Sequence, residues 1–95
     1  MESLDPIIHS ELRLAVMSLL ISLEEADFVF LKNETGVSAG NLSLQLDKLA
    51  GAGYVKITKS FKGKRPCTTI KITRKGIDAF DHYVEALKSY INHRL

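Results

Sequence analysis

The organisation of this chain becomes clear from one segment, Ser38-Ala39-Gly40-Asn41-Leu42-Ser43-Leu44-Gln45-Leu46-Asp47-Lys48-Leu49-Ala50. Leu42, Leu46 and Leu49 recur at i, i+4 and i+7, which predicts a single buried stripe along a helix. Ser38 stands in front of that stripe as the expected N-cap, because its hydroxyl can accept a hydrogen bond from the first helical turn. The segment therefore predicts an amphipathic helix with a fixed orientation.

The opposite side of this helix is made largely of small or hydrogen-bonding side chains. The outward residues are Gly40, Asn41, Ser43, Leu44, Asp47 and Lys48, and the flanking ones are Ala39 and Gln45. Small residues let a helix backbone approach a groove in DNA, and Asn or Gln can pair with an adenine edge through a donor and an acceptor. The alternative is an ordinary solvated face, so the neighbouring segments have to decide.

Length and composition limit the classes of protein that this chain can form. Its 95 residues predict a single domain over residues 1–95, with no room for a separate catalytic or ligand-sensing domain. No apolar run approaches the roughly 20 residues that span a bilayer, and Met1–Asp5 lacks the basic flank of a signal peptide. We therefore expect a cytoplasmic protein that does not bind membranes. Cys67 has no partner for a disulfide or a zinc pair and is expected to be a small strand residue.

The net charge of +2 hides a marked asymmetry between the two halves of the chain. Residues 1–50 hold three Lys or Arg against eight Asp or Glu, whereas residues 51–95 hold ten against three. The positive charge is concentrated, without any acidic residue, in the set Lys56, Lys59, Lys62, Lys64, Arg65, Lys71, Arg74 and Lys75. Such a block attracts a polyanion and predicts salt-dependent binding. A merely solvated charged face is the alternative.

The N-terminal part predicts a first helix of about four turns. Asp5 is a suitable N-cap and Pro6 fits the first helical position. Apolar residues then recur at helical spacing from Ile8 to Leu23, so this helix is expected to belong to the core. His9 and Arg13 lie one turn apart on its more polar side, where they could face a partner, a phosphate or water.

A helix-turn-helix is predicted over about residues 27–50. Asp27 is the expected cap of a short second helix that ends near Gly36, and a short strand can precede it after the turn at Glu24–Asp27. Gly36 supplies the helix end and Ser38 caps the next helix. In this motif the second helix enters the major groove while the first crosses the backbone.

A β-hairpin wing is predicted over about residues 54–73. Tyr54–Ser60 and Cys67–Thr73 both alternate apolar and polar residues, which places Val55, Ile57, Ile70 and Ile72 inward. The connection Phe61–Pro66 is expected to be a loop with Gly63 in the turn and Pro66 ending the pairing. Its three cations, Lys62, Lys64 and Arg65, could reach phosphates or the minor groove.

A long last helix is predicted over about residues 74–93, with Thr73 as its cap. Arg74 and Lys75 in its first turn oppose the helix dipole, which hints at a nearby anion. The spacing of its apolar residues predicts a heptad seam for dimerisation, with packing onto the same domain as the alternative. The expected interface residues are Ile77, Phe80, Tyr83, Val84, Leu87, Tyr90 and Ile91.

The order of these elements resembles the winged-helix transcriptional regulators of the MarR and ArsR superfamily, closest to compact stand-alone archaeal and bacterial domains. The resemblance rests on Leu4–Ser10, Arg13-Leu14, Thr35–Ser38, Gly40–Ser43, Leu46, Lys48-Leu49, Ala52–Val55, Gly63-Lys64, Pro66, Thr68 and Thr73–Gly76. It implies an α+β, mostly helical winged helix-turn-helix with a two- or three-stranded wing and a long C-terminal dimerisation helix. It also implies a homodimer on a pseudo-palindromic operator.

Three features depart from the pattern of these regulators. Relatives often carry a His or a basic residue where this chain has Gln45, and Lys48 is the only cation on the groove helix, beside the acidic Asp47. Leu44 is apolar on a face that should be wet, where it could touch a thymine methyl or a partner protein. No Cys pair or His cluster supports metal sensing, so we expect no metal and no cofactor.

The resulting interpretation is a sequence-specific regulator that binds double-stranded DNA. The residues expected to contact DNA are Ser38, Ala39, Asn41, Ser43, Leu44, Gln45, Lys48, Lys62, Lys64, Arg65, Arg74 and Lys75. The alternative is a winged helix that binds another protein in a transcription or assembly complex. An enzyme is not expected, because the sequence shows no catalytic set of Ser, His, Cys or paired carboxylates and no phosphate-binding glycine loop. Nothing in these residues identifies an operator sequence or a small-molecule effector.

Overall fold

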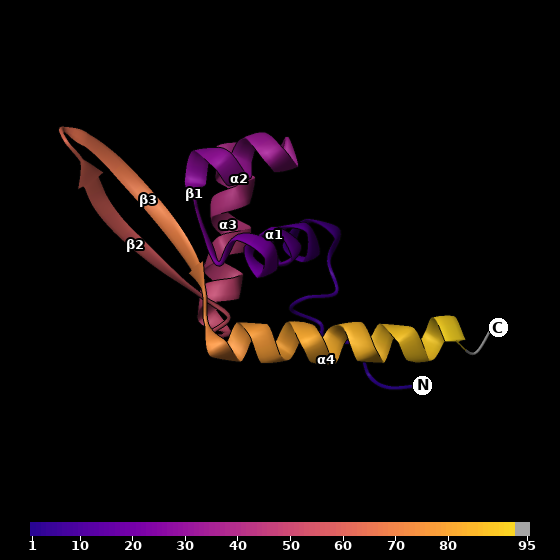
Figure 1. Ribbon diagram of the computed structural model, residues 1–95. Coiled ribbons are helices and arrows are strands. Elements are labelled where there is room, and N and C mark those ends of the chain that lie inside the picture. Colours follow the sequence, from indigo (N-terminus) through magenta and orange to yellow (C-terminus); the bar gives the residue numbers. More distant parts are fainter. Residues whose placement is uncertain (93–95) are drawn as a thin grey trace.

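The computed structural model describes residues 1–92 and has the expected fold class, mostly helical α+β with a winged helix-turn-helix. Its elements are α1 (Glu11–Leu23), β1 (Glu25–Asp27), α2 (Phe28–Thr35), α3 (Ala39–Gly51), β2 (Val55–Lys62), β3 (Arg65–Ile72) and α4 (Arg74–Ile91). Helices α1 to α3 form one body, from which β2 and β3 project as a wing, while α4 runs along the base (Figure 1). The expected helix end near His93 lies outside the described residues.

The first helix begins later than the sequence predicted. Asp5 does cap a turn, since its carboxylate accepts from the Ile7 N–H at 2.8 Å, but the chain then leaves the helical conformation. Ser10 is extended, with φ −154° and ψ 131°, and is the N-cap of α1. The prediction that Asp5 and Pro6 open this helix is therefore wrong, because two capping residues lie close together and the second one starts the helix.

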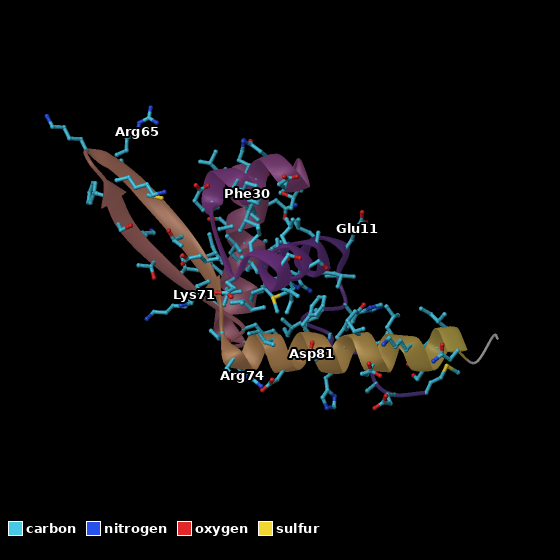
Figure 2. All side chains as sticks on the ribbon, viewed as in Figure 1. Glu11, Phe30, Arg65, Lys71, Arg74 and Asp81 are labelled. Atoms are coloured by element: carbon cyan, nitrogen blue, oxygen red, sulfur yellow. The ribbon has the colours of Figure 1, made fainter. Side chains whose placement is uncertain are left out.

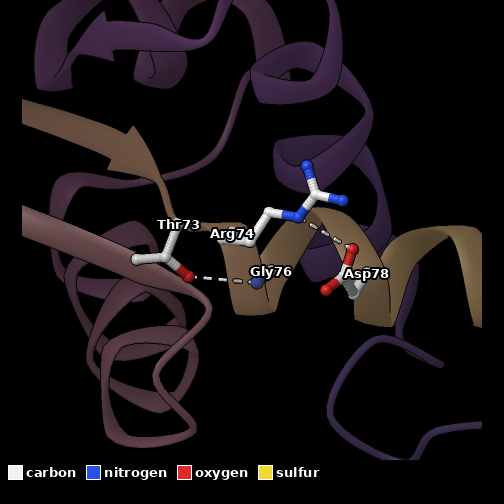
Figure 3. Close-up of polar contacts among 4 residues, drawn as sticks. All are labelled: Thr73, Arg74, Gly76 and Asp78. Atoms are coloured by element: carbon white, nitrogen blue, oxygen red, sulfur yellow. Dashed lines mark hydrogen bonds and ion pairs between the residues drawn. The ribbon is translucent and has the colours of Figure 1, made fainter.

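The other helix caps are those that the sequence predicted. Asp27 accepts from the Phe30 N–H at 2.7 Å, and Ser38 accepts from the Asn41 N–H at 3.2 Å. Gly36 ends α2 in the left-handed conformation with φ 70°. Thr73 accepts from the Gly76 N–H at 3.0 Å and so starts α4 directly after the wing (Figure 3).

The sheet has three antiparallel strands in the order β1-β3-β2. The wing strands are longer than predicted, because Phe61 pairs with Pro66 and Lys62 with Arg65. The prediction that Pro66 ends the pairing is wrong. Phe61 and Pro66 form the second pair from a two-residue turn, and in an antiparallel ladder this pair is not hydrogen-bonded, so the missing N–H of the proline costs nothing. Gly63, with φ 64°, occupies the first turn position, as in a type II′ hairpin.

The core joins the three helices of the body to the base of the wing and to α4. Its buried apolar members are Ile8, Val16, Met17, Leu20, Leu31, Leu42, Leu46, Leu49, Val55, Ile70, Ile72 and Tyr83. All three leucines of the α3 stripe belong to it, so the opposite side of α3 faces outward. No helix within residues 1–92 is long and apolar enough to cross a membrane.

Candidate nucleic-acid interface

Helix α3 presents the outer face that its leucine stripe predicted. The exposed residues on it include Ser38, Ala39, Asn41, Ser43, Leu44, Asp47 and Lys48. Gln45 is half-buried at the edge of the stripe, on the side toward α1. Leu44 is 54% exposed and stands near the middle of this outer face.

A chain of hydrogen bonds connects the edge of α3 to α1. Arg13 of α1 donates from Nη1 to the Gln45 amide oxygen, and Gln45 donates from Nε2 to Asn41 Oδ1 at 3.1 Å. Arg13 also donates to main-chain carbonyls of the N-terminal turn, from Nε to Ile7 and from Nη2 to Pro6. The sequence left the role of Arg13 open, because the start of the first helix was misplaced and a contact 32 residues away cannot be read from helical spacing.

The other edge of α3 adjoins the wing. Ser43, Leu46 and Asp47 line a hollow of about 340 Å³ together with Phe28, Ile57, Lys59 and Thr68. Alternation along the strands puts Lys59 and Thr68, which are cross-strand neighbours, on the same wing face as the buried residues Val55 and Ile70. One face of the wing is therefore continuous with the outer side of α3.

The wing tip carries the three predicted cations and an aromatic side chain. Lys62, Lys64 and Arg65 are exposed, and Arg65 lies at the end of the wing far from α4 (Figure 2). Phe61 is 71% exposed and is paired with Pro66 on the face that also carries Lys59. Phe61 was not among the predicted site residues, although its position between cations in the predicted loop was a usable sign.

Arg74 and Lys75 lie at the opposite end of the wing and have partners within the chain. Arg74 pairs with Asp78 one turn along α4, with 3.2 Å between Nε and Oδ1 (Figure 3). The Lys75 ammonium lies 5.9 Å from the centre of the Tyr54 ring, a distance suited to a cation–π contact. These contacts provide local compensation for two cations at a helix N-terminus, so an external anion is not needed to explain them.

Tyr54 connects the base of the wing to the N-terminal turn. Its hydroxyl donates to Asp5 Oδ2, which lies 49 residues earlier in the chain. Burial, the hydrogen bond to Asp5 and the negative charge of that carboxylate together raise the pKa of Tyr54 to about 12, with burial as the largest cause.

The residues of the predicted dimer seam divide into two groups. Tyr83 is buried in the core of its own chain, where its hydroxyl is 2.8 Å from His9 Nδ1. The remaining six are half-buried or exposed, and they are Ile77, Phe80, Val84, Leu87, Tyr90 and Ile91. Figure 1 shows that the C-terminal half of α4 extends past α1. The N-terminal segment covers part of this half, since the Glu2 N–H donates to Ser89 Oγ and the Tyr90 hydroxyl donates to the Glu2 carbonyl.

Comparison with known proteins agrees with this geometry. Residues 12–91, from the second residue of α1 to the last residue of α4, match the family model described as a winged helix DNA-binding domain. The chain belongs to this winged helix family. The predicted winged helix, and its resemblance to the winged-helix domains of transcriptional regulators, are confirmed.

Several relatives share this winged helix over most of its length. An uncharacterized protein of Methanocaldococcus jannaschii is 40% identical over 78 residues, which cover 82% of this chain and 85% of that protein. A transcriptional regulator homologue from Pyrococcus horikoshii OT3 has a TM-score of 0.86 at 28% identity, covering 92% of this chain and 86% of that one. The transcriptional regulator BldR from Sulfolobus solfataricus has a TM-score of 0.73 at 27% identity, covering 90% of this chain and 60% of that one.

Proposed function

We propose that this winged helix binds double-stranded DNA sequence-specifically, as a homodimeric regulator of transcription, with α3 in the major groove and the wing on the backbone or in the minor groove. The observation that carries the proposal is the hollow lined by Ser43 and Asp47 of α3 and by Lys59 and Thr68 of the wing. Through it, a polar helix face and a hairpin free of acidic residues adjoin each other, as binding to one duplex requires.

The two parts of this surface have different tasks in the proposal. The base contacts come from α3, through Ser38, Ala39, Asn41, Ser43, Leu44, Gln45 and Lys48. The wing supplies phosphate attraction through Lys62, Lys64 and Arg65, because phosphate contacts position a protein while base contacts specify the sequence. Arg74 and Lys75 keep the predicted phosphate role only if DNA also reaches the base of the wing.

The proposed dimer forms through α4, with Val84 and Ile91 on the shared surface. Ile91 is 52% exposed, and these two residues lie seven apart, so they are on one side of the helix. An apolar surface of this kind, on the half of α4 that extends past α1, fits a second copy of the same helix. Two-fold symmetry would place the half-sites about one helical turn, or about 34 Å, apart.

A second candidate function is binding of a partner protein through α3. Leu44 favours it, since an apolar side chain that is 54% exposed near the middle of the outer face suits a protein surface. Asp47 favours it as well, because its carboxylate repels phosphate. The cations of the wing favour DNA.

Duplex affinity measured at two salt concentrations separates these functions. A DNA-binding protein should bind mixed-sequence duplex at low salt and bind it more weakly at moderate salt, since counterions released on binding make affinity salt-dependent. A selected site should bind more tightly than mixed sequence, by at least about a thousandfold for a specific regulator. Absence of duplex binding at both salt concentrations would refute the proposal and favour the protein-binding function.

A further inference from the structure

We infer that Arg13 is a positioning residue for base recognition, which fixes the atoms that Gln45 and Asn41 present to DNA. As a result, this edge of α3 should read hydrogen-bond acceptors, as on guanine or thymine, in preference to the adenine edge that Asn and Gln often read. The inference rests on the proposed function, and it concerns the bases that are chosen rather than whether DNA is bound.

The guanidinium of Arg13 is held in place by main-chain atoms. Its Nε donates to the Ile7 carbonyl, and its Nη2 lies 3.5 Å from the Pro6 carbonyl. Arg13 is half-buried, and the ion pairs among residues 1–92 do not include it. Because two carbonyls of the turn at residues 6–8 accept from Nε and Nη2, the other terminal nitrogen, Nη1, is directed at α3.

The chemistry of arginine determines the orientation of both amides. Arginine carries only donors, so the group of Gln45 that faces Nη1 has to be the amide oxygen. The Gln45 nitrogen is then on the other side, where it donates to Asn41 Oδ1 at 3.1 Å. That bond in turn fixes the Asn41 oxygen toward Gln45, and the orientation set at Arg13 is passed along α3.

The consequence is a surface that offers donors. A bidentate pair with adenine needs an amide oxygen to accept from N6 and an amide nitrogen to donate to N7. Both amide oxygens are engaged inside the chain Arg13–Gln45–Asn41, whereas the Asn41 nitrogen and the second N–H of Gln45 stay available. Guanine N7 and O6 and thymine O4 are acceptors in the major groove and fit these donors.

The test begins with selection of a preferred site from random duplexes, followed by affinities for single base-pair changes in that site. The base pair at which Gln45→Ala loses discrimination is the pair read by Gln45. There the unaltered protein should prefer guanine or thymine over adenine by about tenfold, a typical value for a good base contact. Arg13→Gln, whose amide can both donate and accept, should abolish this preference, and Arg13→Lys, which offers only donors, should retain part of it.

Two further variants separate positioning from the other roles of an arginine. Gln45→Glu keeps a bond to Arg13 but loses its donor, so the preference should move to cytosine, whose N4 is a donor. The base preference of the unaltered protein at the Gln45 pair provides the test if the Arg13 variants fail to fold. Lys32→Gln removes one positive charge from α2 and should leave the base preference unchanged.

The outcomes are distinct. Selection of adenine at the Gln45 pair would overturn the inference, as would Arg13→Gln binding every duplex more weakly with an unchanged base preference. In the second case, the slope of log affinity against log salt concentration (the salt slope) decides between two roles. A fall of about one in this slope would assign a phosphate contact to Arg13, and an unchanged slope with a lower melting temperature would assign a structural role. If the unaltered protein binds no duplex, the proposed function itself fails and the inference with it.

Discussion

Gly76 in the first turn of α4 lies against the main chain of Tyr54 at the base of the wing. A Cβ atom on Gly76 would come within 2.2 Å of the Tyr54 carbonyl oxygen and 3.0 Å of Ile72 Cγ1. The same carbonyl accepts from the Thr73 N–H at 3.0 Å, and Thr73 Oγ1 donates to the Gly53 carbonyl at 2.6 Å. This close contact sets the direction in which α4 leaves the wing.

Replacing Gly76 with Ala should destabilise the protein by about 1–3 kcal/mol, because the added methyl group meets backbone that cannot move cheaply. The free energy of unfolding in urea measures the effect. Gly51→Ala is the matched control. Gly51 is also helical, and no atom beyond its chain neighbours and its own helix backbone lies within 4 Å of its Cβ position, so the effect should be neutral or stabilising by up to about 1 kcal/mol. Equal stability of the two variants would contradict the contact.

Tyr54 should make stability fall between about pH 10 and pH 12. Its folded-state pKa is raised from 10.0 to about 12, so above pH 10 the unfolded chain loses this proton while the folded protein keeps it. The unfolded state then binds fewer protons than the folded state, so the free energy of unfolding decreases as pH rises through this window. Below pH 10 the protein keeps the whole stabilising contribution of the Tyr54 proton. Comparison of urea unfolding at several pH values with Tyr54→Phe, which lacks the titrating group, isolates the effect. Parallel pH profiles would contradict it.

Local chemistry explains which parts of the fold could be predicted. Asp27, Ser38 and Thr73 each precede a periodic apolar segment, and each caps its helix as predicted. The first helix was misplaced because Asp5 and Ser10 are equally good caps by sequence. The choice between them involves contacts with distant parts of the chain, such as the bond from Tyr54 to Asp5.

The candidate site was predictable where it depends on helical spacing and charge, and not where it depends on contacts between elements. The α3 stripe predicted its outer face, and the lysines predicted a basic wing. The bond from Arg13 to Gln45 depends on how α1 crosses α3, which no local pattern contains. The pairing of Phe61 with Pro66 does not follow from the sequence, because proline often ends a ladder, whereas its position in this register tolerates it.

The unaltered protein should be a dimer, with a mass twice 10.6 kDa by light scattering at micromolar concentration and moderate salt. The double change Val84→Glu and Ile91→Glu should give a monomer, because two like charges would face their counterparts across an apolar surface. Melting temperature should change little, since Ile91 is 52% exposed within its own chain and Val84 lies outside the core cluster. His82→Glu, at an exposed position two residues before Val84 and so on the other side of the same helix, adds one charge as a comparison and should leave the dimer intact. A monomeric unaltered protein would refute the proposed dimer.

Replacing both Lys64 and Arg65 with Ala should weaken binding to every duplex and lower the salt slope by about two, because each lost phosphate contact removes about one unit. Discrimination between selected and mixed-sequence sites should remain, since the bases are assigned to α3. Lys32→Ala removes a cation of α2 and should leave the slope unchanged. An equal slope in all three proteins would mean that the wing tip does not reach the phosphates, and the duplex would then have to be held by α3 and the base of the wing.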